Sequence, residues 1–135
     1  MKIKQLAVTI ALSAIAFSLT VAPLSGAELT DQNKNFLAGY EKVHHALVAD
    51  DLAGAKKAAG QLGSQGTELA KSKSLDEART AFAKLSDEAK RMVAGQPGIY
   101  VYHCPMLKKD WVQTSDKVAN PYGGKDMVDC GKIQK

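Results

Sequence analysis

The sequence lacks the residue patterns that mark most enzymes. It has no serine, histidine and acid arrangement, no glycine-rich phosphate loop and no pair of carboxylates at a catalytic spacing. Cys104 could act as a nucleophile with His103 or His44 as its base. A thiol–disulfide exchanger, however, usually carries its two cysteines close together in sequence. We therefore expect a protein without enzymatic activity.

Strong charge is missing as well. The chain has 18 basic and 14 acidic residues and a net charge of +4. Two of the lysines, Lys2 and Lys4, belong to an amino-terminal leader, so the rest of the chain has a net charge near +2. No cluster of lysine and arginine is interleaved with aromatic residues, which excludes nucleic-acid binding.

The amino terminus has the three parts of a secretory signal peptide. Two lysines precede an almost wholly apolar run over residues 6–24, and Ser25-Gly26-Ala27 supplies small residues at the cleavage positions. The run approaches the length that spans a bilayer, so a membrane anchor is the alternative. The proline and small residues that follow the run favour cleavage near Ala27. We expect a signal peptide over 1–27 and a single periplasmic domain over 28–135, without membrane insertion after cleavage.

The first two thirds of this domain have helical periodicity. The apolar spacing predicts a helix from Thr30 or Asp31 to Val48, and a second over about 52–71 with a break near Gly63 to Gly66. Ser74-Leu75-Asp76-Glu77 is a capping box that begins a third helix, which Gly95 and Pro97 end. Amphipathic helices with short connections predict a mainly α fold, an antiparallel bundle of three to four helices.

The last third differs in character. Ile99 to Tyr102 and Trp111-Val112 predict short extended pieces, and Asn120 to Gly124 predicts a turn. Residues 127–130 fit either a single helical turn or an extended strip. We expect an irregular carboxyl-terminal segment attached to the bundle.

This segment holds the only two cysteines. Cys104 lies in His103-Cys104-Pro105-Met106, and Cys130 closes Met127-Val128-Asp129-Cys130. Thiolate, thioether and imidazole groups are the ligands that Cu(I) prefers, and the methionines favour copper over zinc. Yet two cysteines in an exported protein most often form a disulfide, which here would close a loop of about 25 residues and contribute roughly 3 kcal/mol. The residues alone leave both outcomes open, and the two can be redox states of one site.

The same segment carries a family resemblance. Tyr102-His103-Cys104-Pro105-Met106, Trp111, Asn120-Pro121-Tyr122-Gly123 and Met127-Val128-Asp129-Cys130-Gly131 resemble a small exported domain of unknown function, and the helical stretch from Tyr40 to Leu52 agrees with it. That domain occurs alone and fused to periplasmic adaptor subunits of copper/silver efflux pumps. The chain departs from the family where Trp111 is followed by Val112-Gln113 rather than leucine and serine.

The resemblance implies a helical bundle with a metal-binding segment over about 99–131. The implied ligands are Cys104, Met106, Met127 and Cys130, a set that we call the sulfur cluster. Independently of the resemblance, His103 beside Cys104 and His44 on the inner stripe of the first helix are further candidates. The implied ion is Cu(I), with silver or zinc as alternatives. The expected role is metal sequestration or delivery to an efflux adaptor or another copper-handling protein. The alternative is an interaction module held by a Cys104–Cys130 disulfide, which docks on an efflux adaptor through Tyr100, Tyr102, Trp111 and Tyr122.

Overall fold

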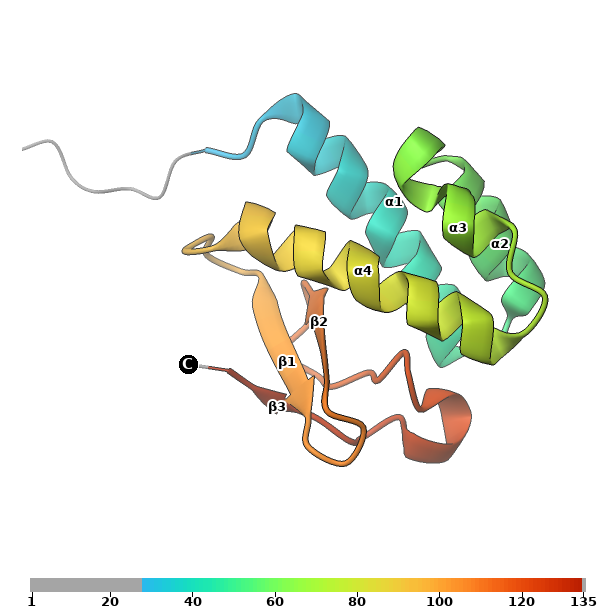
Figure 1. Ribbon diagram of the computed structural model, residues 1–135. Coiled ribbons are helices and arrows are strands. Elements are labelled where there is room, and N and C mark those ends of the chain that lie inside the picture. Colours follow the sequence, from blue (N-terminus) through green and yellow to red (C-terminus); the bar gives the residue numbers. More distant parts are fainter. Residues whose placement is uncertain (1–27, 135) are drawn as a thin grey trace, which may run out of the picture.

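A computed structural model describes residues 28–134, so the predicted signal peptide over 1–27 lies outside the described residues. Four helices are followed by a small sheet, which lies beside the longest helix (Figure 1). Within residues 28–134, no helix is both long enough and apolar enough to cross a membrane. The elements in chain order are α1 (Asp31–Val48), α2 (Leu52–Gly60), η1 (Gly63–Gly66), α3 (Thr67–Ala70), α4 (Leu75–Val93), β1 (Tyr100–Cys104), β2 (Lys109–Gln113), η2 (Gly124–Met127) and β3 (Lys132–Ile133).

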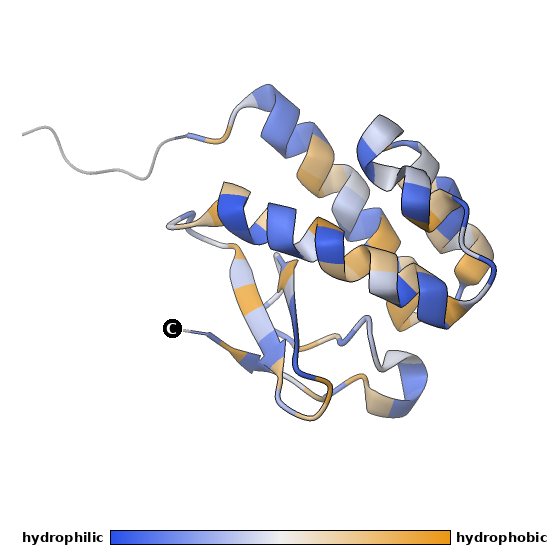
Figure 2. Ribbon diagram, in the orientation of Figure 1, coloured by the Kyte–Doolittle hydropathy of each residue, from blue (hydrophilic) through white to orange (hydrophobic). Residues whose placement is uncertain are grey.

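The helices begin where the sequence predicts them. The side chains of Thr30, Asp51 and Ser74 each accept a hydrogen bond from a backbone N–H of the helix that follows. One bond of the predicted capping box is confirmed, because the N–H of Glu77 donates to Ser74 Oγ. The carboxylate of Glu77 accepts from the N–H of Lys73 and not from that of Ser74. Bands of polar and apolar residues alternate along α4, as expected for an amphipathic helix (Figure 2).

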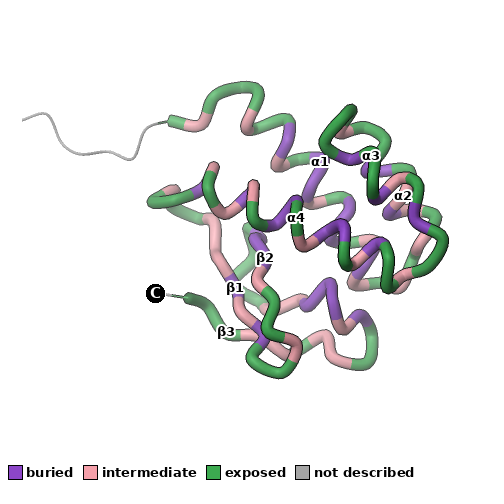
Figure 3. The backbone as a smooth tube through the Cα atoms, in the orientation of Figure 1, coloured by how far each residue is buried: buried purple, intermediate pink, exposed green. Residues whose placement is uncertain are grey.

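The predicted second helix is broken at its glycines. Gly63 has a positive φ of 62°, and a Cβ at Gly66 would lie 1.8 Å from the carbonyl oxygen of Ala59. The close approach of Gly66 to Ala59 therefore requires glycine, and glycine at position 63 takes the left-handed conformation without strain. The buried segments lie mainly where the helices meet one another and the sheet (Figure 3).

The prediction of a mainly α bundle with an irregular end is wrong, because the last third forms a three-stranded antiparallel sheet in the order β2-β1-β3. Residues of β1 pair along their whole length with β2, from Tyr100 opposite Gln113 to Cys104 opposite Lys109. The sequence hides this hairpin because its turn contains neither glycine nor asparagine. Lys108 takes the left-handed conformation instead, with φ of 51°.

A chain of hydroxyl groups joins the outer edge of β2 to the helices. The N–H of Val112 donates to Tyr40 Oη at 3.0 Å, which lies 2.8 Å from Ser86 Oγ. Ser86 Oγ lies 3.0 Å from Tyr122 Oη, and Tyr122 donates its single proton to the carbonyl oxygen of Asp110 at 2.8 Å. Ser86 must then donate to Tyr122, so each hydroxyl donates once and accepts once. The edge of the sheet is thus satisfied by side chains of α1, α4 and the carboxyl-terminal loop.

Replacing Tyr40 with phenylalanine should lower the free energy of unfolding by about 2 kcal/mol, because the buried N–H of Val112 loses its acceptor. Urea denaturation of the oxidised protein measures this change. Tyr100→Phe, at a partly exposed tyrosine outside the chain of hydroxyls, is the control and should change stability by less than about 0.5 kcal/mol. Equal effects of the two substitutions would contradict the role given to the hydroxyl chain.

Candidate metal-binding segment

The two cysteines of the sulfur cluster are joined to each other. Cys104 and Cys130, 26 residues apart, form a disulfide with their Cα atoms 5.5 Å apart. Cys104 ends β1 and is 0% exposed, whereas Cys130 is partly exposed and follows η2 by a few residues. The disulfide that composition favoured is therefore the state of this structure, and the pairing brings together the two segments that the sequence singled out.

The Asn120 side chain holds the segment that carries Cys130. Its amide nitrogen donates to the carbonyl oxygen of Cys130 at 2.9 Å, and its amide oxygen accepts from the N–H groups of Tyr122 and Gly123. The backbone of Asn120 also donates to the carbonyl of Val128 at 2.9 Å. Asn120 itself is 0% exposed, so its side chain makes these bonds from a buried position. The predicted turn at Asn120 to Gly124 is thus the anchor of the second cysteine.

A charged pair fixes this turn to the helical layer. Arg79 on α4 donates to Asp50 Oδ1 at 2.5 Å and, through its Nε, to the carbonyl of Pro121 at 3.0 Å. Asp50 also accepts from the N–H of Lys125 at 3.2 Å. The hydrogen bond from Arg79, reinforced by that from Lys125, holds the pKa of Asp50 below its usual value. Asp50 therefore connects the end of α1 to η2 through its carboxylate.

The two methionines lie in different surroundings. Met127 ends η2, is partly buried against the core and precedes Cys130 by one turn, because the N–H of Cys130 donates to the carbonyl of Met127 at 3.0 Å. Residues 127–130 therefore form a turn and not the extended strip that was the other prediction. Met106 lies in the hairpin turn two residues after Cys104 and is 75% exposed.

His103 is directed away from the cysteines. It neighbours Cys104 on β1, where successive side chains point to opposite faces, and it is partly exposed while Cys104 is buried. Its Nδ1 lies 2.6 Å from Asp110 Oδ1, and Lys90 donates to the other carboxylate oxygen at 2.7 Å. Partial burial would raise the pKa of Asp110, but hydrogen bonds from Lys90 and His103 outweigh it and keep the pKa low.

His44 is a packed histidine on the inner face of α1. It is 1% exposed, and its Nε2 lies 2.8 Å from the carbonyl oxygen of Ala119, so this nitrogen carries the proton that is donated. Burial lowers the pKa of His44 to about 4. His45, on the neighbouring face, is exposed. His44 therefore holds the backbone at Ala119, beside the residue that binds the carbonyl of Cys130. Its contact with the cysteine segment is indirect.

The docking surface predicted for Tyr100, Tyr102, Trp111 and Tyr122 is wrong for three of these residues. Tyr102, Trp111 and Tyr122 are buried, at 2%, 0% and 9% exposure. Tyr102 and Trp111 stack with ring centroids 5.4 Å apart, while Gln113 accepts from Trp111 Nε1 and donates to the carbonyls of Ser115 and Lys117. They form the core beneath the carboxyl-terminal loop. Sequence reasoning missed Gln113, since a glutamine after a predicted strand carries no sign of burial.

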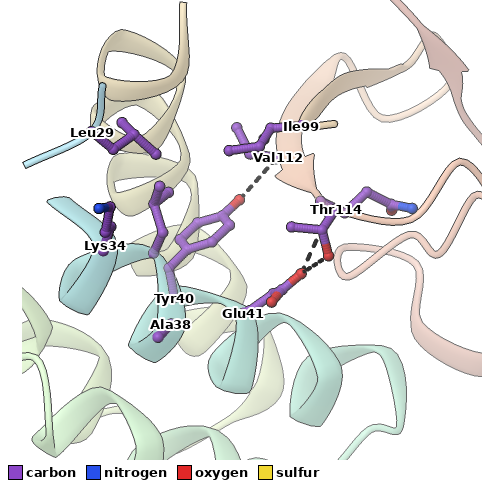
Figure 4. Close-up of a pocket in the computed structure, with 10 residues that line it drawn as sticks. Leu29, Lys34, Ala38, Tyr40, Glu41, Ile99, Val112 and Thr114 are labelled. Carbon is purple, nitrogen blue, oxygen red and sulfur yellow. Dashed lines mark hydrogen bonds between the residues drawn. The ribbon is translucent and has the colours of Figure 1, made fainter. Parts of the chain in front are cut away.

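A separate apolar pocket of about 260 Å³ lies between α1 and β2 (Figure 4). Leu29, Ile99 and Val112 form its walls, and Glu41 at its rim already accepts hydrogen bonds from Thr114. No residue of the sulfur cluster lines this pocket. It is therefore a feature of the helix–sheet boundary, distinct from the cysteine pair.

In the described part of the chain, no three histidine, cysteine, aspartate or glutamate side chains come together as a metal site. The sulfur cluster, with two cysteines and two methionines, is a set of another kind. No family model, curated protein or solved structure matches this chain. The family resemblance of the carboxyl-terminal motifs stays a prediction.

Proposed function

We propose that this protein binds a soft monovalent metal ion, Cu(I) or Ag(I), when its disulfide is reduced. Cys104 and Cys130 supply the thiolates and Met106 and Met127 the thioethers, and the ion is cargo. The protein acts in the periplasm, after cleavage near Ala27, and sequesters the ion or passes it to an efflux adaptor or another copper-handling protein. It works by ligand exchange and without chemical turnover.

One observation carries this proposal: each cysteine segment is held by hydrogen bonds in addition to the disulfide. Cys104 is held by the pairing of β1 with β2, and the carbonyl of Cys130 is held by Asn120. The two Cα atoms lie 5.5 Å apart. Reduction therefore leaves two thiols facing each other on a folded scaffold, which is what a two-thiolate site for Cu(I) needs.

The methionines suit two stages of binding. Met127 shares a turn with Cys130 and is partly buried, so we assign its sulfur to an inner site. Met106 is exposed beside Cys104 and suits the first contact with an arriving or departing ion. Thioethers bind Cu(I) without losing a proton, whereas each thiol must release one to ligate it. Binding should therefore release up to two protons from the cysteines.

The disulfide itself favours a second candidate, a purely structural bridge in an interaction module. Cys104 is wholly buried, as expected of a cysteine that only holds two segments together. The docking partner in that case is an efflux adaptor, met by a surface other than the buried aromatic residues. This candidate predicts that the reduced protein ignores copper.

Anaerobic titration with Cu(I) separates the two candidates. The exported protein is purified, reduced and freed of reductant, and thiols and bound metal are counted on the same sample. We expect about one Cu(I) for each pair of thiols, and Cys104→Ser or Cys130→Ser should abolish binding. Met127→Leu should weaken the affinity by roughly tenfold, or about 1.4 kcal/mol.

Met92→Leu is the matched control, because Met92 is a partly buried methionine on α4. It should leave the affinity unchanged. Reduced protein that shows two free thiols and binds no Cu(I) would refute metal binding and favour the structural disulfide of an interaction module. Zn(II) binding of equal strength that ignores both methionines would refute the choice of copper.

A further inference from the structure

The two cysteines of the disulfide differ in their exposure to solvent. Cys104 is fully buried on the inner face of β1, whereas Cys130 is partly exposed and adjoins the exposed Asp129. In thiol–disulfide exchange, a thiolate must approach one sulfur directly while the other sulfur departs. An external thiolate therefore reaches Cys130, and Cys104 is the leaving group.

After such an attack Cys104 stays opposite Cys130. The strand pairing of β1 and the hydrogen bond from Asn120 keep the two segments in place without the S–S bond. The freed thiolate of Cys104 then faces the new mixed disulfide at a high effective concentration and expels the attacker. A reductant with one thiol is therefore returned unchanged, whereas a reductant with a second thiol can resolve the mixed disulfide itself.

We propose that the natural reductant is an exported dithiol protein that attacks Cys130, an inference that rests on the proposed metal binding because only the reduced pair can ligate an ion. The partner's first thiolate bonds to Cys130 Sγ as the Cys104–Cys130 bond breaks, and Cys104 takes up a proton. The partner's second thiol, deprotonated, then displaces Cys130, which is protonated in turn. Two electrons and two protons pass to this protein, and the partner is left with a disulfide.

The test compares two reductants at equal thiol concentration. The exported protein, with its disulfide intact, is treated with thioredoxin as a dithiol protein or with glutathione as a monothiol, and its free thiols are counted over time. Thioredoxin should expose both cysteines at a rate at least about tenfold higher. A thioredoxin whose second active-site cysteine is serine has one thiol, so Cys104 should expel it and few free thiols should appear. Any adduct that peptide mapping finds on the wild-type protein should lie on Cys130.

Cys104→Ser supplies the matched variant, because it removes the thiol that expels the attacker. Treated with oxidised glutathione, this variant should keep a stable adduct on Cys130, whereas the reduced wild-type protein should convert its adduct to the Cys104–Cys130 disulfide. Glutathione that reduces the wild-type protein as fast as thioredoxin, or a trapped thioredoxin attached to Cys104, would overturn the proposal.

Reduction by a phosphine tests the metal proposal separately. Protein that binds Cu(I) after phosphine treatment but resists thioredoxin contradicts the dithiol partner and leaves metal binding intact. Protein that thioredoxin reduces readily but that then ignores Cu(I) supports the partner and contradicts metal binding.

Discussion

The free energy of unfolding should fall by about 3 kcal/mol as the pH is lowered from 6.5 to 4, because His44 is held neutral in the folded chain. Well above pH 6.5 the imidazole is neutral in both the folded and the unfolded chain and adds no pH dependence. Between pH 6.5 and about 4 the unfolded chain takes up a proton that the buried ring does not accept. Acid in this range therefore favours unfolding.

Other titrating groups act in a different range. The pKa values of Asp50 and Asp110 are lowered by their hydrogen-bonding partners, so the stability they contribute is lost only as the pH falls below the ordinary aspartate value of about 3.8. His45 lies on the same helix but is exposed. We therefore assign the loss that the lowered pKa of His44 predicts between pH 6.5 and 4 to this residue.

Urea denaturation of the oxidised protein at several pH values measures this dependence, with His44→Gln as the diagnostic variant. Glutamine can still donate to the carbonyl of Ala119 but does not titrate, so its slope against pH should be much flatter. His45→Gln is the control and should keep the wild-type slope. A slope unchanged in His44→Gln would place the acid sensitivity elsewhere.

The helices were predictable because local signals agree with the packing. Thr30, Asp51 and Ser74 cap the helices that follow, and the stripe from Phe36 to Leu47 is buried as its spacing indicates. The sheet was missed because β2 begins with the polar pair Lys109-Asp110 and because a lysine takes the left-handed position of its hairpin turn. Pairing between strands is decided by tertiary contacts that a local pattern does not contain.

The pairing of the two cysteines could be expected from the sequence, whereas the contacts that hold their segments could not. The sequence marks Cys104 and Cys130 as partners and leaves disulfide and metal binding as alternatives. It gives no sign that His103 pairs with Asp110 across the hairpin, since that contact depends on a register that only the sheet sets. Asn120 reads as an ordinary turn residue, and its burial beneath the loop becomes evident only from the packing.

Asn120→Ala should be among the most damaging single substitutions, lowering the free energy of unfolding by about 4 kcal/mol. Three side-chain hydrogen bonds are lost, and the carbonyl of Cys130 and the N–H of Tyr122 are left without these partners. Urea denaturation of the oxidised protein gives the value. Asn35→Ala, at an exposed asparagine of α1, is the control and should cost less than about 0.5 kcal/mol.

The same substitution also tests whether the scaffold, rather than the disulfide, positions the thiols. Equilibration with a glutathione redox buffer gives the effective concentration of one cysteine at the other in the folded protein. If Asn120 holds Cys130 opposite Cys104, this effective concentration should fall by about tenfold or more in Asn120→Ala, while Asn35→Ala leaves it unchanged. A destabilised variant with an unaltered effective concentration would mean that Asn120 supports the fold alone. The cysteines would then be held together by their own bond, and the argument for a preformed two-thiolate site would lose its basis.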